Sequence, residues 1–428
     1  MGKKAEKTGI NRRRFLTYAS GSMVATGLSS LFPVFGRAQP KKIKFAYVEA
    51  LTGASALQGQ DHLRGLQFAV EEINAAGGIK SLGGALIELT GGDSETNPTV
   101  GVQLAERLLR EKPVVMIGCE NSSVTYPVTQ VAERARVNFI VDIAMADEIT
   151  QRGFKYLFRF FATGEQACSK EGEHIKMMAK RYNVDIKTVV LLHENTLFGN
   201  STSKTLIRVL PQAGFEIVAK IPYDEDTTSL DAEISKIKRL KPDALLPTSY
   251  IPGAILMTKT MKAFDFAPKI YIGGYSAGHS LPGYVQGVGE LSKYTMNDGN
   301  ANPWRNHPEY QAKSKKYMQK FGGKLFNRTA AFSYLAAKVG ADALERCGST
   351  DPDALNEALR KTRYEQHIVT MPAINFDKTG QMPNASGVTE QILFPESGDA
   401  TNVWPAEFAP EGVSPVIPFP SWKERGKG

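Results

Sequence analysis

The sequence predicts an α/β protein made of two doubly wound, Rossmann-like lobes with parallel sheets, joined by a hinge that the chain crosses several times. Three observations carry this prediction. The chain has 428 residues, more than one ordinary hydrophobic core accommodates. Apolar, strand-like segments alternate with amphipathic helical segments, which is typical of parallel βαβ units. This alternation forms two separate series. The helices that follow have too few strand-like segments between them to form a third sheet.

The first series begins after Pro40. A buried strand is expected at residues 43–50, followed by an amphipathic helix over 62–76 that ends at two glycines. Further strands are expected at 85–91, 114–118 and 138–142, and helices at 99–111 and 124–136. Together these elements predict one doubly wound lobe.

The second series repeats the pattern. Helices are expected at 164–182, 199–213, 230–240 and 253–264, and strands at 188–193, 215–221, 244–247 and 270–273. Long helices then follow at 308–321, 329–346 and 352–361, and the end of the chain is rich in proline and expected to be extended.

Because the last helices lack strands of their own, we expect them to return to the first lobe. The predicted domains are therefore discontinuous: 41–163 with 293–372 form lobe 1, and 164–292 with 373–428 form lobe 2. Ligands of open α/β sheets bind at the carboxyl ends of the strands, which here would face each other across the cleft between the lobes.

Residues 1–38 resemble an export signal, with a basic start, an apolar stretch and a small-x-small site that ends at Ala38. The run Asn11-Arg12-Arg13-Arg14-Phe15-Leu16 resembles the twin-arginine export motif, although its flanking positions differ. An ordinary secretory signal rich in arginine is the alternative. Cleavage would leave Gln39 as the mature N-terminus and place the protein in the periplasm.

Charge and composition narrow the function classes. The net charge is +8, but most of the basic excess lies in residues 1–38, so the remaining chain offers no electrostatic basis for binding nucleic acid. Apolar residues make up 42% and charged residues 22%, as in soluble proteins. Cys119, Cys168 and Cys347 have no metal-binding spacing and allow at most one disulfide.

Four stretches carry a resemblance to a known family. They are Leu51-Thr52-Gly53 with Gly59 ahead of the run AVEEINAAGGI at 69–79, Ile117-Gly118 with Ser122-Ser123, the segment 149–153, and Ile374-Asn375-Phe376-Asp377 with Gly380. In this order the chain resembles the type I periplasmic binding proteins of the leucine/isoleucine/valine-binding family. The resemblance implies the substrate-binding component of an ABC importer, a monomer that binds a small carboxylated ligand, closes by hinge rotation and then docks on a membrane permease, without a cofactor.

The resemblance also implies site residues. It places the serine that holds the ligand carboxylate at Ser122, with Ser123 beside it, between a strand and a helix where free N–H groups attract an anion. A serine at this position is also a common helix N-cap. The loop after the next strand would contribute backbone groups of Ala144 and Ala146, where the family usually has a threonine near Ala146.

Four further residues would line the ligand: Gln58, Phe198, Tyr250 and Tyr275. Amino-acid binders of this family commonly have an acidic residue near Tyr275 that pairs with the ligand ammonium, and the run 273–278 has none. An amine-free aromatic or branched acid is therefore one expectation, with Trp304 as a further wall. An apolar amino acid is the other, if Glu194, Asp224 or Asp298 supplies the carboxylate.

No complete catalytic constellation is found in the sequence. The six histidines form no HExxH pair and no CxxC or GxxxxGK run occurs, while the GxSxG run at 274–278 is not followed by an expected helix as a nucleophile elbow requires, so we expect no catalytic residue, no metal site and no cofactor. Two alternatives remain from other classes. One is an exported enzyme folded around a cofactor, since twin-arginine export carries folded proteins, and the other is a ligand-sensing module of the same fold.

Overall fold

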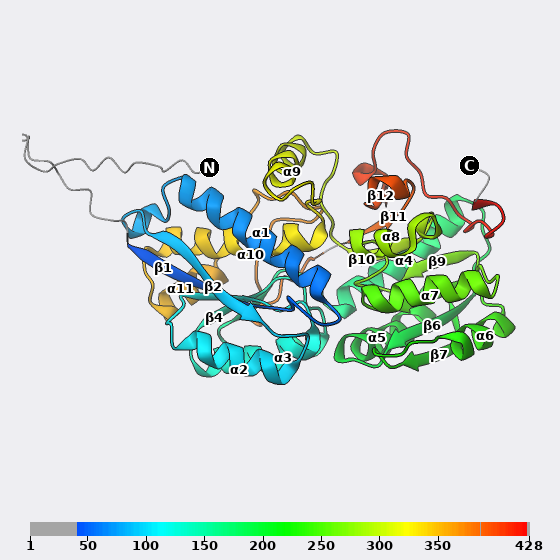
Figure 1. Cartoon of the computed structure of the whole chain (residues 1–428), viewed down its shortest axis with the longest axis horizontal. Helices are drawn as coiled ribbons and strands as arrows, with labels where there is room; N and C mark the ends of the chain where they lie inside the picture. Colours follow the sequence, from blue (N-terminus) through cyan, green and yellow to red (C-terminus); the bar gives the residue numbers. More distant parts are fainter. Residues whose placement is uncertain (1–40, 386, 426–428) are drawn as a thin grey trace, which may run out of the picture. The chain divides into compact units, whose positions relative to one another are not determined.

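The computed structural model describes residues 41–385 and 387–425 (Figure 1). The predicted export signal, its twin-arginine motif, the cleavage site and the mature N-terminus at Gln39 lie outside these residues. The described chain forms two sheets with helices packed on them, which we call lobe 1 and lobe 2. Within the described residues no helix combines the length and the hydropathy that crossing a membrane requires.

Lobe 1 contains the sheet with the order β2-β1-β3-β4-β5, in which every pair of neighbouring strands is parallel. The strands are β1 (Lys42–Glu49), β2 (Leu86–Asp93), β3 (Val115–Gly118), β4 (Asn138–Val141) and β5 (Leu157–Arg159). The helices of this part of the chain are α1 (Ala56–Ala75), α2 (Pro98–Leu109) and α3 (Ser122–Arg134). Every residue of β3 and β4 is buried, as expected for strands covered on both faces.

Three later helices also belong to lobe 1: α9 (Pro308–Lys320), α10 (Arg328–Cys347) and α11 (Pro352–Arg360). Helix α10 packs along α1 so closely that a Cβ on Gly65 would lie 2.1 Å from the carbonyl oxygen of Ala330. Helix α9 reaches α1 through the ion pair between Lys313 and Glu72, and α11 reaches β4 through the Asn356 side chain, which donates to Asn138 Oδ1.

Lobe 2 contains the sheet with the order β12-β11-β10-β9-β8-β6-β7. Its strands are β6 (Thr188–Glu194), β7 (Glu216–Tyr223), β8 (Ala244–Thr248), β9 (Ile270–Gly273), β10 (Met296–Asn300), β11 (Val388–Gln391) and β12 (Thr401–Trp404). Its helices are α4 (Gly164–Arg181), α5 (Leu197–Ala213), α6 (Asp231–Leu240), α7 (Ile251–Ala263) and α8 (Pro282–Val288). Strands β6 to β10 are parallel, whereas β11 runs antiparallel to both β10 and β12.

The structure differs from the sequence prediction at the boundary placed at residue 293. Strand β10 pairs with β9 and β11 and therefore lies in lobe 2, although the sequence assigned it to lobe 1. The C-terminal segment, expected to be extended and part of lobe 2, contributes β11 and β12 to the same sheet. Helix α1 begins at Ala56 rather than at residue 62, because Gly59 lets its first turn pack on the end of β1.

The three cysteines are free thiols. Cys119 and Cys168 are buried and Cys347 is partly exposed. Burial raises the pKa of both buried thiols well above its usual value, so these two side chains behave as small apolar groups at neutral pH.

Candidate functional site

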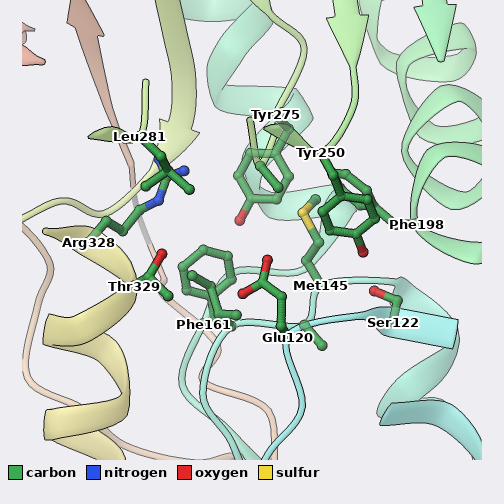
Figure 2. Close-up of a pocket in the computed structure, with 13 residues that line it drawn as sticks. Glu120, Ser122, Met145, Phe161, Phe198, Tyr250, Tyr275, Leu281, Arg328 and Thr329 are labelled. Carbon is green, nitrogen blue, oxygen red and sulfur yellow. The ribbon is translucent and has the colours of Figure 1, made fainter. Parts of the chain in front are cut away.

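A pocket lies where the carboxyl ends of the two sheets face each other, and about 360 Å³ there is free of protein atoms, part of it continuous with open solvent (Figure 2). Lobe 1 contributes the loops that follow β3 and β4, and lobe 2 contributes the loops that follow β8 and β9. The first residues of α5 and α10 complete the wall. Strand ends of this kind are where open α/β sheets bind their ligands.

The turn between β3 and α3 forms one side of the pocket. Glu120 and Ser122 line it and are only 5% and 1% exposed. The side chain of Asn121, the residue before α3, does not cap this helix but donates from Nδ2 to Ser55 Oγ at 2.8 Å. The first N–H groups of α3 therefore have no side-chain partner and lie at the positive end of the helix dipole.

The loop after β4 is held by a buried arginine. Arg159 donates from Nη1 to the carbonyl oxygens of Ala144 at 3.2 Å and Ala146 at 2.9 Å. Burial lowers the pKa of Arg159 to about 10, which leaves the guanidinium charged at neutral pH. Ala146 N–H donates to Ser122 Oγ at 3.3 Å, so the two loops of lobe 1 are joined directly behind the pocket.

Aromatic side chains form the apolar walls. Phe198 and Tyr250 lie 5.2 Å apart between ring centroids, and Phe161 and Tyr275 lie 6.2 Å apart. Tyr275 has a backbone φ of +53° and is fully buried, with its hydroxyl donating to the carbonyl oxygen of Ala162 at 3.3 Å. Rings arranged in this way can enclose a branched or aromatic side chain.

The amino end of α10 contributes a positive side chain and a hydroxyl. Arg328 and Thr329 line the pocket from the side opposite Ser122 in Figure 2 and are 3% and 0% exposed. Arg328 Nη1 is bound to Glu390 Oε1 at 2.9 Å, which balances the buried charge. Arg328 Nε and Thr329 Oγ1 are buried and have no hydrogen-bond partner within the described residues.

Buried ionisable groups lie beneath Glu120. Its Oε1 accepts a hydrogen bond from Gln58 Nε2 at 3.2 Å, and its Oε2 lies 2.6 Å from His62 Nε2. Burial alone would lower the pKa of His62, but the carboxylates of Asp142 and Glu49 raise it well above its usual value. The pocket therefore has a negative floor under Glu120 and a positive side at Arg328.

The comparison with known families decides the classification. The family model described as "Periplasmic binding protein" matches residues 42–392. This chain belongs to the periplasmic binding protein family. Membership makes it a substrate-binding protein, in agreement with the pocket between its sheets.

The curated relatives of this periplasmic binding protein carry similar names. The chain is 28% identical over 333 residues to Leu/Ile/Val-binding protein homolog 8 of Brucella abortus, which covers 74% of this chain and 80% of that protein. It is 27% identical over 379 residues to Leu/Ile/Val-binding protein homolog 7 of Brucella suis. The matched region covers 85% of this chain and 91% of that protein.

Solved structures of the same fold include a leucine binding protein and a branched-chain amino acid transporter substrate binding protein. The leucine binding protein LivK of Thermotoga maritima superimposes with a TM-score of 0.72 at 22% identity, covering 84% of this chain and 97% of that one. LivJ of Streptococcus pneumoniae, solved in complex with isoleucine, gives 0.73 at 21% identity, covering 88% and 100%. The predicted type I fold is thereby confirmed.

Five of the eight residues predicted from the sequence line the pocket of this periplasmic binding protein: Ser122, Ala144, Phe198, Tyr250 and Tyr275. The other three do not.

Each of those three has a physical reason to lie outside. Gln58 is buried behind the pocket, where its amide is bound to Glu120. Ser123 lies one residue further along α3, on a different side of the helix from Ser122. Both backbone groups of Ala146 are already bonded, its N–H to Ser122 and its carbonyl oxygen to Arg159.

The carboxylates considered for a ligand amine also lie elsewhere. Glu194 is bound to the N–H of Tyr250 behind the pocket wall, and Asp298 is bound to His174 within lobe 2. Asp224 lines a separate hollow beside β7. Trp304 packs on Phe408 and borders another hollow near α9.

Sequence reasoning missed the two charged residues of the pocket, Glu120 and Arg328. A signal existed for Glu120, because it lies two residues before Ser122 in the same strand-to-helix turn. No signal existed for Arg328, since only the packing of α10 on α1 brings the amino end of α10 to the strand ends.

Proposed function

We propose that this periplasmic binding protein is the substrate-binding component of an ABC importer and that it holds a small carboxylated ligand between its lobes. The observation that carries the proposal is the composition of the pocket wall, to which both lobes contribute buried side chains. A ligand bound there touches both lobes and favours the form in which they meet, which a permease can recognise.

The charges of the pocket favour a ligand with two polar ends. Arg328 and Thr329 offer donors to a carboxylate, whereas Glu120 favours an ammonium group and disfavours an anion beside it. The expectation of an amine-free acid rested on the missing carboxylate near Tyr275, and Glu120 supplies one from the other lobe. An apolar amino acid is therefore the ligand proposed, in line with the isoleucine bound to the similar LivJ.

The proposed function is binding without catalysis. No histidine or cysteine is among the described residues that line the pocket, and the hydroxyl of Ser122 has Ala146 N–H as its neighbour rather than a base. We further propose export of the chain by residues 1–38, work as a monomer in the periplasm, and delivery to an inner-membrane permease. The proposed lobe boundaries follow the sequence division, with β10 moved to lobe 2.

A thermal-shift screen tests the ligand class. Each apolar amino acid is paired with the acid that lacks its amine, for example leucine with 4-methylpentanoate and phenylalanine with 3-phenylpropanoate. A ligand that binds only the folded protein raises its melting temperature. We expect the amino acids to raise it and the amine-free acids to have little effect, whereas the reverse order would exclude Glu120 as an ammonium partner.

The role of Ser122 is tested by calorimetric titration of the ligand found in the screen. Ser122→Ala should weaken binding by roughly 1 to 3 kcal/mol, because the ligand loses a hydrogen bond in a buried site. Ser123→Ala is the matched control, since that hydroxyl belongs to the same helix turn but lies outside the pocket. Equal affinities in the two variants would remove Ser122 from the site.

A further inference from the structure

A second group of ionisable side chains lies below the pocket, and the proposed ligand contacts do not use it. Glu49 is the last residue of β1, His62 lies in α1, and Asp142 follows β4 directly. All three are 0% exposed. Three separate elements of lobe 1 thus direct a carboxylate, an imidazole and a second carboxylate to one point.

The three side chains are close enough to reach one cation, once His62 and Asp142 move apart from their present direct contact. His62 Nδ1 lies 2.6 Å from Asp142 Oδ2 and 3.9 Å from Glu49 Oε1, and one ligand atom from each residue lies within 4.8 Å of the others. Zinc lies about 2.0 to 2.2 Å from nitrogen and oxygen ligands, so ligand atoms of one site are about 3 to 4 Å apart.

Glu49 provides a second observation that does not depend on this spacing. Neither oxygen of its carboxylate has a hydrogen-bond partner of normal geometry within the described residues, and the backbone N–H of Glu120 is the one nearby donor that acts on its pKa. A buried carboxylate without donors is costly, and native proteins pair such groups or use them to coordinate metal ions. Asp142 is partly satisfied, because its Oδ1 accepts from Ile143 N–H at 2.9 Å, which leaves Oδ2 facing His62.

The charge balance points the same way. His62 has Glu49 and Asp142 at Nδ1 and Glu120 at Nε2, so one imidazole faces three carboxyl groups. Acidic side chains therefore outnumber basic ones at this point. A divalent cation removes this excess without protonating any of them.

The surroundings of His62 resemble the second shell of a metal site. A metal-binding histidine usually gives its other ring N–H to a carboxylate, which orients the ring and sets its tautomer. Here Nδ1 faces Glu49 and Asp142, and Nε2 lies 2.6 Å from Glu120 Oε2. Glu120 is thus the outer partner of the histidine and at the same time part of the pocket floor.

From this geometry we propose that Glu49, His62 and Asp142 bind a divalent transition-metal cation, with zinc as the first probe. One imidazole and two carboxylates form a ligand set accepted by zinc and manganese. With Nδ1 on the metal, His62 Nε2–H donates to Glu120, so the metal holds the carboxylate of Glu120 in place under the ligand. The site has a structural role in lobe 1 and organises the pocket floor.

The first test needs no variant and no transport ligand. The mature protein is purified from the periplasm in metal-free buffers, and its metals are measured by mass spectrometry. A second sample is unfolded with EDTA and refolded with ZnCl₂, with MnCl₂ or without metal. We expect about one metal ion per chain and a higher melting temperature after refolding with metal, as for other proteins whose metal binding couples to folding.

Variants locate the ion. Asp142→Asn keeps the side-chain volume and should lower metal occupancy at least about tenfold. Glu171→Gln is the matched control, because Glu171 is also fully buried with both carboxylate oxygens unpartnered, but lies in α4 of lobe 2. The control should retain the metal content of the unaltered protein.

Two outcomes would overturn the proposal. One is an unaltered protein that holds less than about a tenth of an equivalent, both as exported and after refolding with either metal, and melts at the same temperature with and without metal. The other is full metal content in Asp142→Asn. If that variant does not fold, the refolding test on the unaltered protein decides alone.

Discussion

Glu49 and Glu194 occupy the same position in the two lobes. Each is the last residue of an interior strand, β1 in lobe 1 and β6 in lobe 2. Each strand is followed by a helix whose early glycine packs on the strand end. A Cβ on Gly59 would lie 1.9 Å from the carbonyl oxygen of Ala50, and a Cβ on Gly199 would lie 2.0 Å from that of Glu194.

The partners of the two carboxylates differ. Glu194 has neutral donors, the N–H of Tyr250 at 3.0 Å and the hydroxyl of Tyr223 at 3.3 Å, and burial raises its pKa to about 8. Glu49 instead faces His62 and a second carboxylate, and burial raises its pKa as well. The same backbone position thus buries a carboxyl group among neutral donors in lobe 2 and, as proposed above, beside a cation in lobe 1.

The largest effect is expected from the glycines that the two lobes share. Gly59→Ala and Gly199→Ala each place a methyl group about 2 Å from a backbone oxygen, and backbone cannot move aside as a flexible side chain can. We expect each to cost more than about 4 kcal/mol of unfolding free energy or to prevent folding. Urea denaturation measures the loss.

Gly172→Ala is the control for both. Its Cβ would lie 3.3 Å from the Cβ of Ala213, which is tight but not a clash with backbone. A mild loss in the control and a large loss in both test variants supports the equivalence of the two strand ends. If only one of the two test variants loses little unfolding free energy, the two strand ends are not equivalent.

The next effect is the pH dependence that Glu194 brings. Between its ordinary value of 4.5 and about 8, the folded protein holds a proton that the unfolded chain has released. The free energy of unfolding therefore falls as the pH rises through this window, by on the order of 3 kcal/mol between pH 5 and 8. Glu194→Gln lacks this contribution and should gain stability relative to the unaltered protein as the pH rises.

Denaturation curves at pH 5, 6.5 and 8 check this difference. Glu216→Gln, an exposed change on the neighbouring strand β7, should run parallel to the unaltered protein at all three values. A Glu194→Gln curve that also runs parallel would mean that the carboxyl of Glu194 is already ionised at pH 5.

The smallest effect concerns the residues that precede the two helices. Thr196 caps α5, accepting from Gly199 N–H at 3.2 Å, whereas Ser55 precedes α1 and accepts from Asn121 Nδ2 instead. Thr196→Ala and Ser55→Ala should each cost about 1 kcal/mol of unfolding free energy. Only Ser55→Ala should also weaken ligand binding, because Asn121 lies in the turn that forms the pocket.

Ligand affinity is measured in both variants by titration calorimetry. Equal affinities would mean that the hydrogen bond between Asn121 and Ser55 does not affect ligand binding. A Ser55→Ala protein that binds as tightly as Thr196→Ala would show that Asn121 is held in place by the backbone of the turn alone.

The extent to which the fold could be predicted depended on how the strands are stabilised. Strands such as β3, with the buried sequence VMIG, are visible as apolar runs because both faces of a parallel sheet are covered. Strand β10 reads MNDGN and β11 reads VTEQ, which contain no apolar run and no alternation. They form because β9 offers an edge, which is a tertiary effect that local sequence does not carry.

The pocket residues also divide into those that the sequence could predict and those whose place depends on tertiary packing. Ser122 and Tyr250 were predicted through the family resemblance, and each lies between a strand and a helix, where parallel sheets bind ligands. Arg328 was not, because its place depends on α10 packing against α1. The group of Glu49, His62 and Asp142 has no motif spacing, since its members come from a strand end, a helix and a loop.

The packing of α10 on α1 also sets an order of events during synthesis. The hydroxyl of Ser333 donates to the carbonyl oxygen of His62, 271 residues earlier in the chain. At about 5 to 20 residues per second, a ribosome needs roughly 15 to 55 seconds to travel that far. For this time the face of α1 that packs on α10 lacks that partner, although β1 and β2, which also contact α1, are already made, so lobe 1 completes its packing only after its last helices emerge.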